Sequence, residues 1–178
     1  MKTSNIFPRH TNYDLPYAVR GDGCYIIDKN DKRYLDASCG AAVSCLGHSD
    51  ITVKNAIIEQ TEKLAFAHTS FFTTDPAEKL ANLLAENSPE GLNKIYFVSS
   101  GSEAVEASLK LARQYFIEIG EPERHRVISR KQSYHGNTLG ALAAGGNVWR
   151  RSFFEKILVK TSLISPCYPY RHQNVNET

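Results

Sequence analysis

Two runs of alternating apolar and polar residues, 24–28 and 33–36, flank a short polar turn. This pattern is typical of a β-hairpin. After a loop, Asp50 stands in the position of an N-cap, and Val53 begins a series of apolar residues at helical spacing that extends to Leu64. The spacing predicts a first helix directly after Asp50.

Residues 73–91 predict a second helix. Asp75 is its expected N-cap, and Glu78 is expected to close a capping box at the same end. The apolar residues of this helix are expected to face inward, namely Leu80, Leu83 and Leu84.

Strands and helices then alternate along the chain. Residues 93–98 predict a short buried strand, and residues 103–119 predict a long helix that ends at Gly120. Residues 126–129 predict another strand, and a turn at 133–138 leads into a short helix. This alternation indicates an α/β domain with a largely parallel sheet.

Composition narrows the class of protein. The 178 residues are 42% hydrophobic, which is enough for one domain with a core. The net charge of +2 is spread along the chain, which argues against nucleic acid and anionic membranes as partners. No stretch approaches the ~20 apolar residues that cross a bilayer, and residues 1–10 lack the apolar core of a secretion signal. Four cysteines without a CxxC pair favour a reducing, cytoplasmic compartment, and no metal site is expected. The polar tail at 170–178 is expected to be disordered.

The turn that follows residue 98 is a candidate phosphate site. A helix that starts at the carboxyl end of a strand presents free N–H groups and a partial positive charge. Gly101 lets a ligand approach the backbone closely, and the hydroxyls of Ser100 and Ser102 are possible further donors. The alternative is that Ser100 and Glu103 form only an ordinary capping box. The turn matches neither GxGxxG nor GxxxxGK[ST], so a dinucleotide or nucleoside triphosphate is not favoured.

The turn at 133–138 also follows a predicted strand, which places Tyr134 at the same edge of the sheet. Its ring could stack on a flat heteroaromatic ligand, and His135 could pack beside that ligand or tune its protonation. The alternatives are a core tyrosine and an ordinary turn histidine. A phosphate site and a stacking ring at one edge together suggest a cofactor.

Three segments, 31–48, 97–113 and 133–147, together closely resemble class III pyridoxal-phosphate-dependent aminotransferases. The resemblance runs from about Gly21 to the end of the chain. It implies a fold-type I architecture, with residues 1–50 as an N-terminal segment and residues 51–178 as the first part of the large cofactor-binding domain. It also implies a homodimer that transfers an amino group from an amino acid or ω-amine to a keto acid.

The resemblance further implies specific site residues. Gly101 and Ser102 would bind the phosphate of pyridoxal 5′-phosphate, and Tyr134 would stack on its pyridine ring; the role of His135 is less certain. The family places segments similar to 41–48 and 68–76 near the substrate entrance or the dimer seam. Ser44, Phe71 and Phe72 are therefore weaker candidates, and the two phenylalanines are expected to pack in the core.

One departure from the family pattern bears on catalysis. No lysine of this sequence matches the family's Schiff-base lysine, and five lysines of the second half are expected to be solvated or to flank strands: Lys94, Lys110, Lys131, Lys156 and Lys160. That amine is the covalent anchor and the base of transamination, so no catalytic residue is assigned and the chain alone is expected to be inactive. The family also inserts later strands between the strands near 98 and 127, which leaves sheet edges unpaired in an N-terminal portion. An aminomutase or decarboxylase of the same fold and a non-catalytic cofactor-binding or dimerising chain are the alternatives.

Overall fold

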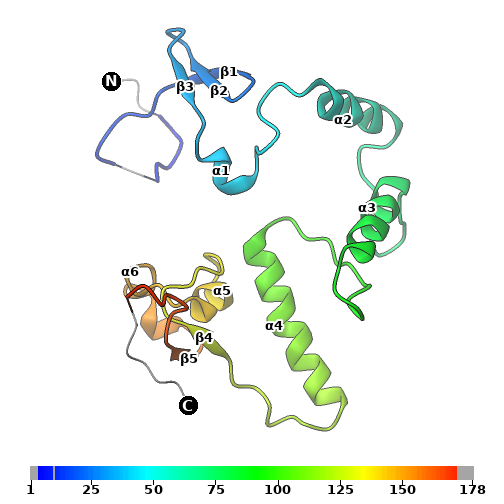
Figure 1. The fold of residues 1–178 in the computed structure, drawn as a ribbon, viewed down its shortest axis with the longest axis vertical. Coiled ribbons are helices and arrows are strands. Elements are labelled where there is room, and N and C mark those ends of the chain that lie inside the picture. The colour runs from blue at the N-terminus through cyan, green and yellow to red at the C-terminus, as the bar shows by residue number, and fades with distance from the viewer. Residues whose placement is uncertain (1–3, 10, 172–178) are drawn as a thin grey trace. The chain divides into compact units, whose positions relative to one another are not determined.

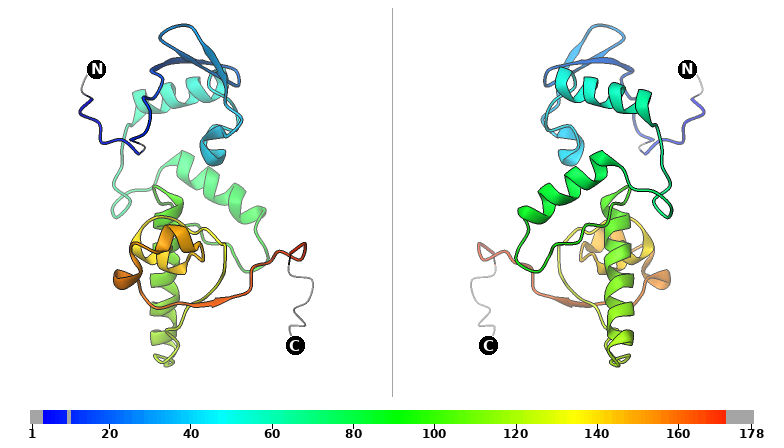
Figure 2. Two further views of the ribbon diagram at one scale, coloured as in Figure 1. Left: turned by 90° about the vertical axis from the view of Figure 1, so that its left-hand side faces the viewer. Right: turned by 90° about the vertical axis from the view of Figure 1, so that its right-hand side faces the viewer.

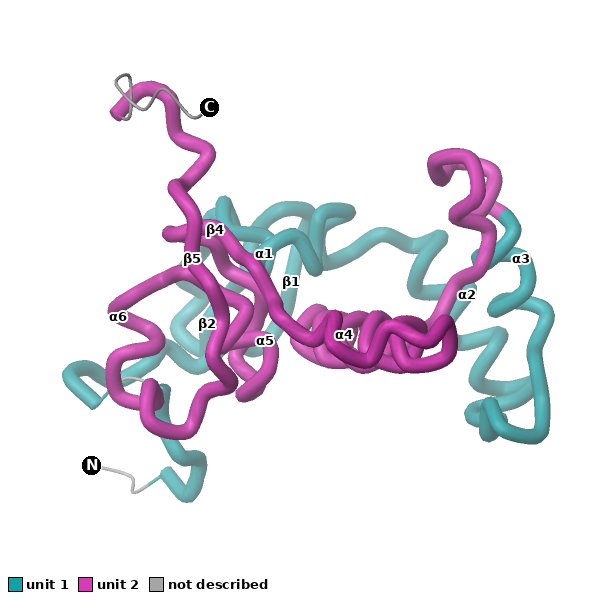
Figure 3. The backbone as a smooth tube through the Cα atoms, turned by 90° about the horizontal axis from the view of Figure 1, so that it is seen from below, with its two compact units in different colours: residues 1–82 teal, residues 83–178 magenta. Residues whose placement is uncertain are grey.

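A computed structural model describes residues 4–9 and 11–171 (Figure 1). Most of the polar tail that was expected to be disordered lies outside these residues. The chain divides into two compact units, residues 1–82 and residues 83–178, each described below by itself (Figure 3). The predicted boundary at residue 50 concerns the complete family fold and stays a prediction.

The first unit begins with an antiparallel sheet of three strands in the order β1 (Ala18–Asp22), β2 (Tyr25–Asp28) and β3 (Arg33–Leu35). The pairing of β2 with β3 confirms the predicted hairpin, whereas β1 was not predicted. The carboxylate of Asp28 closes the turn, because it accepts hydrogen bonds from the N–H groups of Asn30 and Lys32 and from the hydroxyl of Tyr34.

The two predicted helices of the first half are present. Asp50 caps α2 (Ile51–Lys63) as predicted, with its Oδ1 2.9 Å from the N–H nitrogen of Val53. The cap predicted for α3 (Asp75–Glu86) is wrong, because Asp75 lies inside the helix and Glu78 accepts a hydrogen bond from the Thr73 hydroxyl instead. The predicted inward face of α3 is also wrong, since its three leucines are 41–57% exposed. An amphipathic pattern identifies an apolar face but not what covers it.

The second unit is built on the long helix α4 (Gly101–Glu118), which Ser100 caps and which ends before Gly120 in the left-handed conformation (φ +82°). The remaining elements are α5 (Leu139–Ala144), α6 (Val148–Arg151), the 3₁₀ turn η1 (Glu155–Ile157), and the parallel pair β4 (Ile128–Arg130) and β5 (Ser162–Ile164). Helix α5 lies beside α4 in the views of Figures 1 and 2. Its residues 141–144 are buried and form the apolar core of this unit in the described part of the chain. The predicted α/β architecture is therefore confirmed.

The strand predicted at residues 93–98 is wrong, since this segment has no regular structure and Tyr96 is 80% exposed. A strand forms only when a neighbour takes up its backbone hydrogen bonds, and no described segment does so here. The accessible surface of the chain is 15842 Å², whereas two separate compact units of about 90 residues each would expose about 10,000 Å² in total. Much apolar surface is therefore uncovered, as the exposed Tyr96 and the leucines of α3 show.

Candidate functional site

The N-terminus of α4 carries the predicted capping box. Ser100 Oγ accepts a hydrogen bond from the N–H of Glu103 at 3.2 Å, and the Glu103 carboxylate accepts one from the N–H of Ser99 at 2.8 Å. The N–H groups of Gly101 and Ser102 have no hydrogen-bond partner among the described residues. The ordinary capping box is thus present, and it leaves two donors at the positive end of the helix for another acceptor.

Gly101 has no structural need to be glycine within this chain. It lies in the first turn of α4 without a positive φ, and a Cβ built on it would meet no atom within 4 Å. Glycine lowers helix stability relative to alanine, so neither the backbone nor the packing explains it. A ligand that approaches the backbone at this point would.

Ser102 joins the first turn of α4 to the second predicted turn. Its hydroxyl donates to Oδ1 of Asn137 and accepts from the N–H of Asn137, both at 3.1 Å. Gly136 lies directly against the helix, since a Cβ on it would stand 2.5 Å from Ser102 Oγ and 2.9 Å from Ser102 Cα. The structure therefore brings the two predicted corners together. The hydroxyl hydrogen of Ser102, which was expected to be available to a ligand, is instead donated to Asn137.

Tyr134 lies in this loop and is 60% exposed, so the alternative of a core tyrosine is wrong. The guanidinium carbon of Arg150 lies 5.0 Å from the centroid of its ring, a geometry typical of a cation–π contact. His135 is exposed and makes no hydrogen bond within the described ranges. Its role stays a prediction.

Sequence reasoning missed Glu106, which lies one turn after Ser102 on α4. Its carboxylate accepts hydrogen bonds from the N–H groups of Gly140 at 2.8 Å and Ala141 at 3.2 Å. The hydroxyl of Thr138 also binds it, and this hydrogen bond is the main reason why the pKa of Glu106 lies below its usual value, against a smaller opposing effect of burial. The sequence contained one signal for Glu106: its carboxylate lies four residues after Ser102 and therefore on the same face of the helix.

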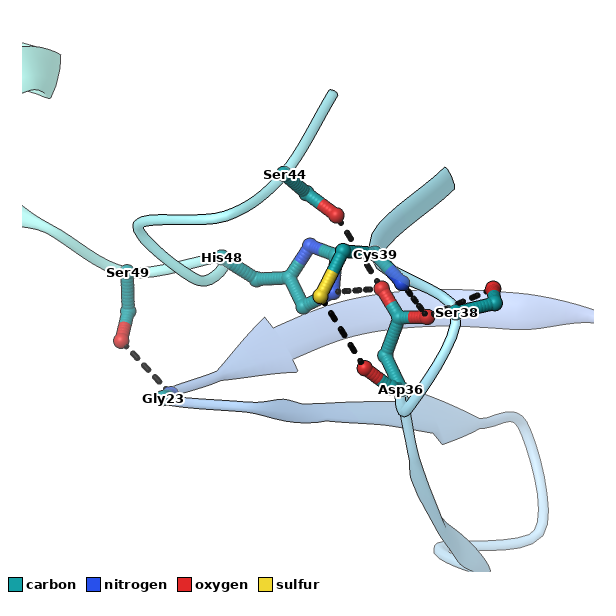
Figure 4. A network of polar contacts seen from close by, with 7 residues as sticks. All are labelled: Gly23, Asp36, Ser38, Cys39, Ser44, His48 and Ser49. Carbon is teal, nitrogen blue, oxygen red and sulfur yellow. Dashed lines mark hydrogen bonds and ion pairs between the residues drawn. The ribbon is translucent and has the colours of Figure 1, made fainter. Parts of the chain in front are cut away.

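A second polar network surrounds Asp36 in the first unit (Figure 4). Its carboxylate accepts hydrogen bonds from His48 Nε2 at 2.9 Å, from the hydroxyls of Ser44 and Ser38 at 3.1 Å each, and from the N–H of Cys39 at 3.0 Å. Burial alone would raise the pKa of Asp36, but these hydrogen bonds, led by that of His48, lower it below its usual value. Ser44 is thus a partner of Asp36.

This network anchors an unusual backbone segment, α1 (Cys39–Ala42). Its four residues have φ between 48° and 73°, and three of them are not glycine. Left-handed backbone of this kind costs roughly 1–2 kcal/mol for each residue with a side chain. The segment leads into a pocket of about 480 Å³ lined by residues 43–48 and by α2.

Phe71 and Phe72 are 77% and 68% exposed, so the expectation that they pack in the core is wrong.

The chain matches the family described as aminotransferase class-III over residues 7–178, and it belongs to this family. An uncharacterised aminotransferase of Schizosaccharomyces pombe is 43% identical over 178 residues, which are 99% of this chain and 39% of that protein. The adenosylmethionine-8-amino-7-oxononanoate aminotransferase of Geobacter sulfurreducens is 37% identical over 86% of this chain and 34% of its own length. The family resemblance seen in the sequence is therefore confirmed.

Solved structures of transaminases have the same fold. An omega transaminase from Pseudomonas jessenii in complex with PMP superimposes with a TM-score of 0.86 at 26% identity, over 97% of this chain and 40% of its own. A thermostable (S)-enantioselective omega-transaminase from Thermomicrobium roseum gives a TM-score of 0.87 at 32% identity, over 96% and 40%. The chain spans about two fifths of the length of these relatives.

Membrane-spanning helices and metal sites are both absent from the described residues. None of their helices has the length and apolar character that a membrane span requires. Likewise, they contain no group of three or more His, Cys, Asp or Glu side chains arranged to hold a metal ion.

Proposed function

We propose that this chain supplies the cofactor-phosphate and ring contacts of a pyridoxal-phosphate-dependent aminotransferase, in which Gly101 and Ser102 hold the phosphate and Tyr134 lies on the pyridine ring. The observation that carries this proposal is the pair of hydrogen bonds between Ser102 and Asn137. It holds a helix N-terminus and an exposed aromatic ring at one corner of the second unit.

The residues at this corner fit a phosphate. The N–H groups of Gly101 and Ser102 point out of the helix start, and a dianion there gains from both hydrogen bonds and the helix dipole. Charge-assisted hydrogen bonds contribute about 1.5–3 kcal/mol each. The carboxylate of Glu103 would oppose an anion, but it is turned back onto the N–H of Ser99.

The ring of Tyr134 fits a flat aromatic ligand, because the ring is exposed. The positively charged guanidinium of Arg150 lies beside it. Stacking adds about 0.5–1.5 kcal/mol to the burial of the ring. When bound, pyridoxal phosphate supplies the electron-accepting ring on which an amino group is transferred. This chain's residues bind and orient that group. An amino acid or ω-amine as donor, a keto acid as acceptor, and a homodimeric assembly belong to the same proposal.

The proton-transferring amine is not assigned to this chain. The five lysines of the second unit, between Lys94 and Lys160, are all exposed. Within the described ranges none of them makes a hydrogen bond or ion pair with the turn at 99–103 or the loop at 133–138. We therefore assign binding to these residues and leave the covalent anchor outside them.

Pyridoxal phosphate itself tests this division. The purified chain is expected to bind it saturably, and reduction with borohydride followed by mass spectrometry of peptides is expected to give no stoichiometric label on one lysine. A stoichiometric adduct at a single lysine would contradict the assignment of the anchor. No saturable binding, of pyridoxal phosphate or of its aldehyde-free analogue pyridoxine 5′-phosphate, would contradict the cofactor site itself.

A further inference from the structure

Glu106 connects α4 to the loop that carries Tyr134. We propose that Glu106 is a positioning residue for the cofactor ring, because its carboxylate holds the start of α5 and thereby fixes Tyr134 relative to Gly101 and Ser102. This inference rests on the cofactor site proposed above. It adds to that site a residue that is not expected to touch either the phosphate or the pyridine ring of the cofactor.

The carboxylate serves as the N-cap of a helix to which it does not belong. Thr138 occupies the N-cap position of α5, but its side chain makes no capping hydrogen bond within that helix. The Glu106 carboxylate instead accepts hydrogen bonds from the N–H groups of Gly140 and Ala141. A side chain on Gly140 would collide with the carboxylate. The position of α5 is thus set by α4, through an anion at the positive end of the helix dipole.

The opposite end of α5 is held in a complementary way. Arg151 is buried, with 6% of its surface exposed. Its Nη1 donates hydrogen bonds to the carbonyl oxygens of Ala143 at 2.8 Å and Gly145 at 2.7 Å. A cation at the negative end of the helix matches the anion at its start. Hydrogen bonds therefore hold both ends of helix α5, and they restrict the end of the loop that leads into it.

Two sets of contacts hold the loop of Tyr134. On one side, Ser133 Oγ donates a hydrogen bond to the carbonyl oxygen of Arg130 at 2.7 Å and accepts one from the N–H of Gly146 at 3.0 Å. Tyr134 is exposed, and its described ring contact is with Arg150, which is itself exposed. On the other side, two links join its loop to α4, one at Asn137 through Ser102 and one at 138–141 through Glu106. Loss of the second link keeps the Ser133 contacts but removes one of the two links that set the position of Tyr134 relative to the turn at 99–103.

A double-mutant cycle with Tyr134 tests this role, with pyridoxine 5′-phosphate as the probe because it lacks the aldehyde that reacts with lysines. Isothermal titration of the chain is expected to give about threefold to tenfold weaker binding for Glu106→Ala, the range that a lost ring contact represents. Glu106→Gln, which keeps one acceptor oxygen, is expected to fall between. Glu118→Gln on the last turn of the same helix is the matched control and is expected to bind like the parent. Tyr134→Ala is expected to add little to Glu106→Ala, because both remove the same contact.

Inorganic phosphate separates positioning from a general loss of structure. Its affinity is expected to be equal in the parent and in Glu106→Ala, because the N–H groups of Gly101 and Ser102 belong to α4 alone. Additive effects of the two substitutions, unchanged binding in Glu106→Ala, or an equal loss for inorganic phosphate would each overturn the inference while the cofactor site stands. If Glu106→Ala does not fold, the same cycle with Glu106→Gln decides. A parent chain that binds no pyridoxine 5′-phosphate would overturn the site and the inference together.

Discussion

Ser102 and Asn137, thirty-five positions apart in the sequence, exchange two hydrogen bonds of 3.1 Å through a single serine hydroxyl. This pair joins the start of α4 to the loop of Tyr134. A helix N-terminus alone attracts any anion, and an exposed tyrosine alone contacts many ligands. Held together, they form the site that we propose for a ligand with both a phosphate and a flat ring.

Gly101 allows the ligand contact to be tested apart from folding. Gly101→Ala is expected to leave the unfolding temperature unchanged or slightly higher, because the added Cβ meets no protein atom within 4 Å. It is expected to weaken pyridoxine 5′-phosphate by about tenfold or more, because the methyl group stands where the phosphate must approach the backbone. Titration calorimetry and thermal unfolding measure the two effects.

Gly120, at the other end of α4, is the matched control. Its φ of +82° is unfavourable for alanine, although a Cβ there would also meet nothing within 4 Å. Gly120→Ala is expected to lower the free energy of unfolding by about 1–2 kcal/mol and to leave the affinity intact. Equal affinity loss in both variants would show that the Gly101 effect is indirect.

Gly136 is expected to be intolerant of any side chain. Its φ of +135° is unfavourable for any residue with a side chain, and a Cβ atom at this position would lie only 2.5 Å from Ser102 Oγ. Both effects disfavour a side chain. Gly136→Ala is expected to lower the free energy of unfolding by about 1–3 kcal/mol and to weaken ligand binding, because the loop must move away from α4. A variant that matches the parent in denaturant unfolding would contradict the close packing of this loop.

Local signals explain what could be predicted from the sequence. The starts of α2 and α4 were found because Asp50 and Ser100 bind N–H groups three residues away. The turn at 99–103 and Tyr134 became candidates because each follows a predicted strand; the first of these strands is absent from the structure, and the phosphate and ring roles stay predictions. These features depend on neighbours within one turn of the chain.

The features that were missed or wrong depend on distant partners. Glu106 binds N–H groups 34 and 35 residues away, and no periodicity reveals that. Residues 93–98 have the composition of a strand, but a strand needs a paired neighbour. The leucines of α3 likewise mark an apolar face without naming its partner. The sequence pattern predicts which face of an element is apolar, but only the tertiary structure shows which residues that face contacts.

The left-handed segment α1 predicts an unusual response to glycine. Ala41, at φ 58°, is strained by its side chain, so Ala41→Gly is expected to raise the free energy of unfolding by about 1 kcal/mol. Ala112→Gly, in the ordinary helix α4, is expected to lower it by about 0.5–1 kcal/mol. Denaturant unfolding of both variants measures the difference, and two losses of similar size would argue against the left-handed turn.

The Asp36 network predicts a dependence of stability on pH. Because folding lowers the pKa of Asp36, the unfolded chain binds the proton more tightly. The stabilisation is therefore full above the usual pKa of about 3.9 and is lost as pH falls through the folded value. Unfolding measured between pH 7 and pH 2 is expected to show a smaller acid loss in Asp36→Asn, which is also less stable at pH 7. Identical pH profiles for variant and parent would contradict the network.

We propose above that the turn at 99–103 and the loop of Tyr134 bind one ligand. Amide and aromatic spectra of the chain, recorded by heteronuclear magnetic resonance during titration with pyridoxine 5′-phosphate, test this proposal. We expect the N–H signals of Gly101 and Ser102 to shift downfield, and the ring signals of Tyr134 to shift along the same saturation curve. Saturable binding that moves other residues and leaves these three unchanged would contradict the claim.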